Sequence, residues 1–177
     1  MKKELTLHFL TSLILFVLIS IFHNYLSLTF WPLWIGAVIG TLLPDVDHII
    51  YVYYLRPQEL TSQRVAYMAN RGQLLQTWNL LASTRSERLN LILHTIMFQV
   101  LFLVLSFFVM SSSSSLLGRG IVIAFLLHLF VDQIIDLKQT GSLLNWFKNI
   151  PIIFDKLQLN IYLIFNFICI LIFSFLM

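Results

Sequence analysis

Two short motifs in this chain hold side chains that bind divalent metal ions in proteins. The first is the string from Leu43 to His48, which reads Leu-Pro-Asp-Val-Asp-His. On a helix Asp45 and His48 share a face because they lie three residues apart, so they could hold one ion together. Asp47 points elsewhere, where it could orient a ligand, act as a base or bind a second ion. For Asp45 taken alone, plain N-capping after Pro44 is the alternative.

The second motif is His128-Leu-Phe-Val-Asp132, whose i, i+4 spacing places the imidazole and the carboxylate on one face of a helix. Such a pair suits a divalent metal that accepts nitrogen and oxygen ligands. The alternative is a His–Asp hydrogen bond that holds helices together. Asp136 continues the stripe, but it lies close to Lys138, and we interpret it as part of a solvated helix end.

His8 and His94 complete the candidate set, although a lone histidine on an apolar helix is more often a satisfied core residue. Their depth favours a common site. A helix rises about 1.5 Å per residue, which places His94 about 9 Å beyond Arg88 and Asp132 about 9 Å before Lys138. The Asp45–His48 string and His8 lie at similar depths. Four segments therefore bring their ionisable groups to one layer, which predicts a convergent metal site.

The composition indicates the elements that must carry these residues. The chain has 177 residues, of which 59% are hydrophobic and 11% are charged, whereas a soluble domain is about 25% charged. Lys, Arg, Asp and Glu are absent from residues 5–44, 89–118 and 157–177. We expect an all-α, polytopic transmembrane helical bundle of about five crossings, formed by residues 1–177 as a single domain. The slight basic excess, 11 Lys and Arg against 8 Asp and Glu, has no dense patch, and we expect no nucleic-acid partner.

The crossings follow from the apolar runs, since about 20 apolar residues span a bilayer as a helix. Residues 31–55 form one crossing broken at Pro44, with Pro32, Gly36 and Gly40 as further interruptions. Irregular backbone at this depth is tolerated beside a covered cavity, so the break suggests a pocket. A capping box at residues 84–87 opens the helix that carries His94. The full set of crossings is Leu5–Leu26, 31–55, about 88 to Met110, Gly120–Leu137, and a last span that ends near Met177.

The distribution of basic residues predicts the topology. With a cytoplasmic N-terminus, a basic loop at 56–88 with an interfacial helix and a connector at 138–156 both lie inside. Ten of the 11 Lys and Arg residues are then cytoplasmic, and Arg119 alone lies outside. We expect an integral protein of a bacterial-type inner membrane, with membrane lipid as its surroundings. Trp146 would sit at the membrane interface.

These motifs, taken in order, resemble the YdjM-like family of inner-membrane metal-dependent hydrolases and, more distantly, the zinc-dependent phospholipase C group. The resemblance covers about residues 5–137. It implies a helical fold and one or two divalent ions, with zinc expected and manganese or iron as alternatives. Family members carry His-Arg-Gly before the histidine that aligns with His94. This chain has Leu89-Asn90-Leu91 there, so Arg85 or Arg88 would have to replace the arginine. The metal ligands implied are His8, Asp45, Asp47 or His48, His94, His128 and Asp132, and of the two alternatives we expect His48 to bind the ion.

The function that these residues favour is metal-assisted hydrolysis of a phosphoester or lipid-type substrate at the cytoplasmic leaflet, with Asp47 as the catalytic residue. One alternative is a metal-ion or proton conduit, which would need polar residues continuing to the outer side of the membrane. The outer halves of the spans are almost purely apolar. A second alternative is a catalytically inactive membrane protein in which a metal ion staples helices together. The sequence makes no prediction of the oligomeric state.

Overall fold

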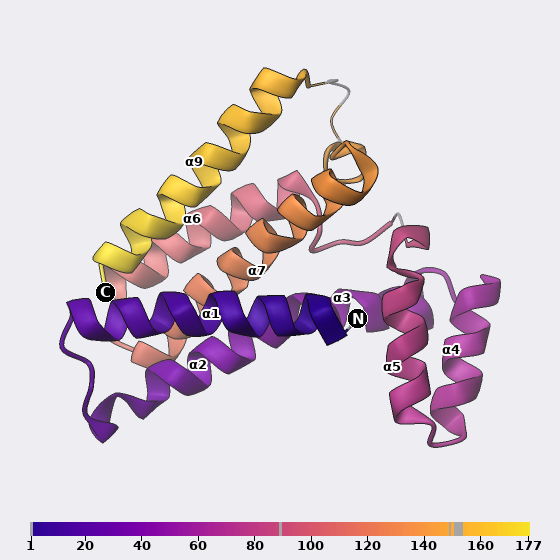
Figure 1. The fold of residues 1–177 in the computed structure, drawn as a ribbon, viewed down its shortest axis with the longest axis horizontal. Coiled ribbons are helices and arrows are strands. Elements are labelled where there is room, and N and C mark those ends of the chain that lie inside the picture. Colours follow the sequence, from indigo (N-terminus) through magenta and orange to yellow (C-terminus); the bar gives the residue numbers. More distant parts are fainter. Residues whose placement is uncertain (1, 89, 149, 151–153) are drawn as a thin grey trace.

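The computed structural model describes residues 2–88, 90–148, 150 and 154–177, and every regular element within them is a helix. The helices form an elongated bundle, with an antiparallel hairpin of two shorter helices at one end (Figure 1). The elements are α1 (Lys2–Phe22), η1 (Leu28–Phe30), α2 (Trp31–Leu42), η2 (Leu43–Asp45), α3 (Val46–Ile50), η3 (Tyr51–Leu55), α4 (Leu60–Asn70), α5 (Leu74–Ser83), η4 (Arg85–Glu87), α6 (Ile96–Ser112), α7 (Leu116–Thr140), α8 (Leu144–Phe147) and α9 (Lys156–Phe175).

Four helical segments are long and apolar enough to cross a membrane: Glu4–Phe22, Leu28–Leu55, Leu116–Thr140 and Lys156–Phe175. A fifth helix, α6, is apolar but has 17 residues. At about 1.5 Å per residue it is about 25 Å long, a little less than the hydrocarbon core of a typical bilayer. The expected helical membrane bundle is therefore confirmed, with four long helices and one shorter helix in place of five equal crossings.

The predicted break at Pro44 is present. The α2 helix ends at Leu42, a 3₁₀ turn covers Leu43–Asp45, and α3 follows directly. Proline lacks a backbone N–H and its ring clashes with the preceding turn, so the α-helical hydrogen bonding cannot pass through it unchanged. The segment then widens into a π-helix at Tyr51–Leu55. Both irregular turns flank the Asp-Val-Asp-His string.

The interpretation of Gly36 and Gly40 as interruptions is wrong, because α2 is continuous through both. The two glycines face α7 at very short range. A Cβ atom added at Gly36 would lie 2.3 Å from the Leu117 carbonyl oxygen, and one at Gly40 would lie 2.3 Å from that of Ile121. Gly120 of α7 makes a similar close approach from the other helix, since a Cβ atom added there would lie 2.5 Å from the Leu33 carbonyl oxygen. Small residues let the two backbones approach closely, as in other membrane helix pairs.

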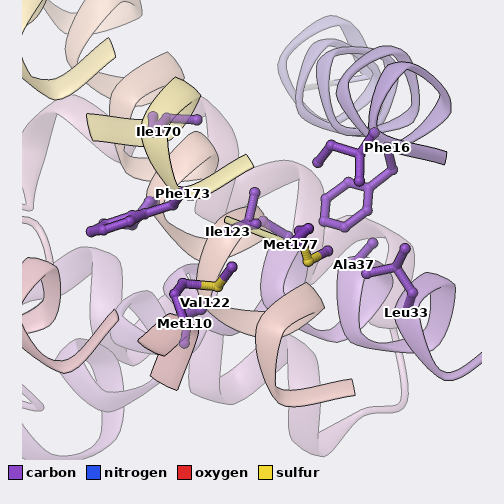
Figure 2. Packing of buried hydrophobic residues seen from close by; sticks show 12 residues of the cluster. Phe16, Leu33, Ala37, Met110, Val122, Ile123, Ile170, Phe173 and Met177 are labelled. Atoms are coloured by element: carbon purple, nitrogen blue, oxygen red, sulfur yellow. The ribbon is translucent and has the colours of Figure 1, made fainter. Parts of the chain in front are cut away.

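An apolar core lies at the end of the bundle away from the hairpin. It takes side chains from α1, α2, α6, α7 and α9, and Phe16, Leu33 and Ile123 within it are completely buried (Figure 2). Helix α7 supplies several residues to this core and is the most deeply buried of the long helices. The position of His128 and Asp132 on α7 therefore places them inside the protein.

The capping box predicted at residues 84–87 is wrong. Residues Arg85–Glu87 form a 3₁₀ turn, and α6 begins at Ile96, where the Thr95 side chain accepts a hydrogen bond from the Phe98 N–H. His94 consequently lies in a non-helical segment. The connector also differs from expectation, because α7 continues to Thr140 and the connector contains α8. Trp146 of α8 is 1% exposed, so it is buried and does not sit at an interface.

Candidate metal centre

Three side chains from two helices form a buried group whose ligand atoms lie within 4.8 Å of one another: His8 of α1 with His128 and Asp132 of α7. The two imidazole rings stack at 3.9 Å between centroids. Asp132 lies between the two histidines, with Oδ1 3.0 Å from His8 Nε2 and Oδ2 3.2 Å from His128 Nε2. Two nitrogen donors and one carboxylate are a set that zinc, manganese or iron accepts. This group could hold a metal ion.

The hydrogen bonding of His128 shows which of its nitrogens is available. His128 Nδ1 lies 2.6 Å from the carbonyl oxygen of Thr41, which can only accept, so Nδ1 carries the proton and donates it. In the neutral ring Nε2 is then an unprotonated acceptor, and it has no hydrogen-bond partner. Two acceptors, His128 Nε2 and the Asp132 carboxylate, thus face each other in a dry site. A cation between them removes this conflict, and backbone-anchored histidines are typical metal ligands.

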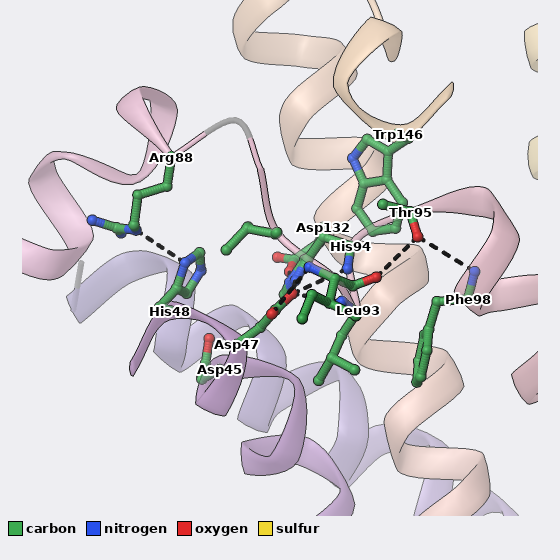
Figure 3. Close-up of polar contacts among 12 residues, drawn as sticks. Asp45, Asp47, His48, Arg88, Leu93, His94, Thr95, Phe98, Asp132 and Trp146 are labelled. Atoms are coloured by element: carbon green, nitrogen blue, oxygen red, sulfur yellow. Dashed lines mark hydrogen bonds and ion pairs between the residues drawn. The ribbon is translucent and has the colours of Figure 1, made fainter. Parts of the chain in front are cut away.

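His94 joins the group through hydrogen bonds on both sides of its ring. Nε2 lies 3.0 Å from Asp132 Oδ2, and Nδ1 lies 3.1 Å from Asp47 Oδ2 (Figure 3). Burial alone would lower the pKa of His94, but the hydrogen bonds with Asp132 and Asp47 raise it to about 9. The ring is further confined by the edge-on indole of Trp146, 5.6 Å away between centroids.

Asp47 is completely buried and joins α3 to the segment before α6. Its carboxylate accepts hydrogen bonds from the backbone N–H groups of Ile92, Leu93 and His94, at 3.1, 2.6 and 3.3 Å. These donors are free because the segment is not helical. With the His94 ring as a fourth partner, Asp47 has the geometry of a residue that orients a ligand.

The remaining predicted ligands, Asp45 and His48, lie at the edge of the group. Asp45 Oδ1 is 3.8 Å from His128 Nε2, and the Asp45 side chain is partly exposed. The His48 ring stacks on that of His94 at 5.3 Å, but its Nδ1 accepts a hydrogen bond from Arg88 Nε at 3.1 Å. A neutral His48 that accepts at Nδ1 carries its proton on Nε2, so in this arrangement neither nitrogen is free to bind a metal.

Residues outside the predicted ligand set also contact the site, among them Arg85, one of the two arginines that the sequence offered as a substitute for the family arginine. Arg85 Nη1 donates to Asp132 Oδ1 at 2.7 Å, and Arg85 Nη2 pairs with Asp136 Oδ1 at 3.5 Å. Burial would lower the pKa of Arg85, but Asp132 and Asp136 hold it above its usual value. Asp136 also accepts from Trp146 Nε1 at 2.8 Å, so it is a partner within the site and not part of a solvated helix end. The i, i+3 spacing of Arg85 and Arg88 could have indicated two cations on one side of a turn.

A pocket opens beside the metal-ligand group. Its walls come from the start of α1, from α3, and from α5 with the turn that follows it. Two of the candidate ligands, His8 and Asp45, line it together with Arg85 and Arg88. The lining residues are Glu4, Leu5, His8, Asp45, His48, Ile49, Trp78, Leu81, Ala82, Arg85 and Arg88.

These features define a class: a helical integral membrane protein with a buried His/Asp centre beside a pocket lined by two arginines and two acidic residues. The family model described as YdjM inner membrane protein matches residues 1–175, and the chain belongs to that family. The resemblance drawn from the motifs is thereby confirmed at the level of the family. No curated protein and no solved structure matches the chain.

Proposed function

We propose that this protein is a membrane-embedded, divalent-metal-dependent hydrolase that acts on a phosphoester or lipid-type substrate at the cytoplasmic leaflet. One observation carries the proposal: the buried His128 Nε2 has no hydrogen-bond partner among the described residues and lies 3.2 Å from the Asp132 carboxylate, in a group whose third member, His8, lines a pocket. A hydrogen-bonded structural histidine would not leave its free nitrogen toward another acceptor.

His8, His128 and Asp132 would hold the ion, with His94 and Asp45 near enough to complete its ligands after small side-chain movements. A divalent ion there would supply Lewis acidity that activates water and polarises a phosphoryl oxygen. Zinc is the expected ion, and manganese and iron suit the same donors. Asp47 would orient His94 and keep its Nε2 directed at Asp132. Thr41 would do the same for His128 through its carbonyl oxygen.

The pocket supports a substrate with one anionic and one apolar part. Its basic side holds Arg85 and Arg88, while Leu5, Ile49 and Trp78 supply apolar surface. The residues that line the pocket come from the start of α1, from η2 and α3, and from α5 with the turn after it, and these elements meet at one end of the bundle (Figure 1). If the N-terminus is cytoplasmic, as the basic residues predict, a lipid headgroup in the inner leaflet would meet this opening.

Metal analysis tests the proposal first. We would measure zinc, manganese and iron by elemental mass spectrometry in detergent-purified wild type and in the His128→Ala/Asp132→Ala variant. The matched control is His23→Gln, because His23 contacts the Ser174 carbonyl oxygen, outside the candidate metal group. We expect stoichiometric metal in the wild type and the control, and its loss in the double variant. Hydrolysis of nitrophenyl phosphates and of phospholipids in mixed micelles would follow.

Each other outcome rejects the proposal in a defined way. Absence of metal from all three proteins, even after supplementation, would leave histidines that only join helices. A bound metal without hydrolysis of any phosphoester would favour a metal staple. Metal-dependent ion flux in proteoliposomes without hydrolysis would favour a conduit.

A further inference from the structure

Two arginines, the partly exposed Arg85 and the buried Arg88, flank the candidate metal centre, and they differ in their counter-charges. Arg85 pairs with Asp132 and, more distantly, with Asp136. Its charge is therefore compensated inside the protein, which is the usual condition for burying an arginine.

Arg88 has no such compensation. The residue is 5% exposed, and its three hydrogen-bond acceptors are all neutral. Nε donates to His48 Nδ1 at 3.1 Å, Nη1 donates to Thr84 Oγ1 at 3.0 Å, and Nη2 donates to the Leu81 carbonyl oxygen. Among the residues that the structure describes, no carboxylate oxygen lies within 4.0 Å of an Arg88 nitrogen, so Arg88 forms no ion pair.

The guanidinium of Arg88 also has N–H groups that donate no hydrogen bond within the described part of the protein. It carries five N–H groups, and the three contacts above use three of them. These contacts hold the planar group in one orientation at the wall of the pocket that His8 and Arg85 also line. Burial and the neighbouring charge of Arg85 lower the pKa of Arg88 to about 10, although the charges of Glu87 and Asp45 act in the opposite direction.

Asp45 is the carboxylate in the same pocket that lies on the side of the metal-ligand group, 3.8 Å from His128 Nε2. Glu4 at the pocket wall accepts a hydrogen bond from Gln139 Nε2 at 3.0 Å. Neither acidic side chain forms an ion pair with Arg88, so the two unused N–H groups of its guanidinium stay available to a ligand that enters the pocket.

We propose that Arg88 is the anchor of an anion subsite in this pocket, and that its ligand is a phosphate group. The planar guanidinium of an arginine presents its N–H groups in a fixed fork, which matches the geometry of phosphate oxygens. The phosphate could be inorganic phosphate or the phosphodiester of a lipid headgroup. The claim that this bound phosphate is the substrate rests on the proposed function, whereas anion binding does not require the metal.

Calorimetric titration of the full-length, detergent-purified protein tests the subsite. The two probes are inorganic phosphate and a short-chain phosphatidylglycerol, each added to wild type, Arg88→Gln, Arg88→Lys and Arg64→Gln. Arg64 is the matched control, since it is exposed on α4 outside the pocket. We expect Arg88→Gln to weaken binding at least tenfold, Arg88→Lys to weaken it less, and Arg64→Gln to stay within twofold of wild type.

The probes and variants separate the outcomes. Binding of inorganic phosphate assigns a free phosphate, and binding of phosphatidylglycerol alone assigns a lipid headgroup. The proposal is overturned if neither probe binds wild type. It is also overturned if wild type, Arg88→Lys and Arg88→Gln all bind the probe with equal affinity. If Arg88→Gln does not fold, Arg88→Lys decides the test. A folded Arg88→Lys variant, with the thermal midpoint of wild type, that binds the probe with wild-type affinity would overturn the proposal that the guanidinium anchors the anion.

A second arm separates this inference from the proposed hydrolase. The same titrations on the His128→Ala/Asp132→Ala variant should retain binding, because Arg88 does not depend on the ion for its position. Loss of binding there, with Arg88→Gln unaffected, would show that the anion binds the metal and would overturn the subsite. An absence of hydrolysis in any assay would leave these binding results unchanged.

Discussion

Asp47 connects two distant parts of the chain at the metal centre. Its carboxylate satisfies the backbone of residues 92–94 and orients the His94 ring. A carboxylate that accepts several N–H bonds in a dry site is strongly favoured in its charged form. A single side chain thus holds both the local backbone and a candidate ligand in place.

Asp47→Asn tests this double role. The amide has one acceptor oxygen, and its NH₂ group would face backbone donors, so we expect a loss of about 1–3 kcal/mol in stability. Metal affinity should fall by about 10–100-fold, as for other partners of metal-bound histidines. Thermal unfolding and metal titration measure the two effects. Asp155→Asn is the control, because Asp155 caps α9 and asparagine caps about as well. Wild-type metal affinity in Asp47→Asn would exclude the orienting role.

At the scale of the elements, the close contact between α2 and α7 sets the position of His128. Gly36, Gly40 and Gly120 allow the two backbones to meet. Thr41 follows Gly40 directly, and its carbonyl oxygen accepts from His128 Nδ1. The separation of the helices therefore determines whether the His128 ring keeps its orientation.

Gly40→Ala tests the coupling between packing and site. Its Cβ would lie 2.3 Å from a backbone carbonyl oxygen, so the helices must separate. Overpacking of this kind costs about 1–3 kcal/mol, and we expect weaker metal binding together with a lower thermal midpoint. Gly118→Ala is the matched control on α7, since its Cβ would come no closer than 3.5 Å to a neighbouring side chain, that of Ser115. Equal behaviour of the two variants would show that the contact does not support the site.

At the scale of the whole molecule, the functional features gather at one end of the bundle. The N-terminus lies beside α3 and α5, and the last residue lies at the far end of α1 (Figure 1). The basic residues predict that the end with the site is cytoplasmic. That orientation decides which leaflet could supply a substrate.

Cysteine labelling tests the orientation. In a Cys169→Ser background we would place single cysteines by Gln73→Cys, in the turn between α4 and α5, and by Ser114→Cys, in the turn between α6 and α7. Both positions are exposed. A membrane-impermeant maleimide should label Gln73→Cys only in inverted vesicles and Ser114→Cys only in spheroplasts. The reverse pattern would invert the topology, and labelling of both from one side would contradict a crossing by α6.

The sequence by itself determined the class of protein, the break at Pro44 and the residues of the buried group. The long charge-free runs allow only membrane helices, because an unpaired charge or backbone group is costly in lipid. Proline acts through its own ring, so its effect needs no tertiary partner. The same cost makes His8, His128 and Asp132 conspicuous within apolar helices.

Tertiary structure decided how those residues are held. His94 lies outside the helix, in a segment whose N–H groups donate to Asp47, 47 residues earlier in the chain. Gly40 is a contact point and not a break, because α7 passes close to it. Arg88 forms no ion pair because no carboxylate of the described chain comes within 4.0 Å of it, although Asp45 lines the same pocket. Each of these outcomes depends on a partner far away in sequence, and a local pattern of residue types does not specify which distant group will arrive.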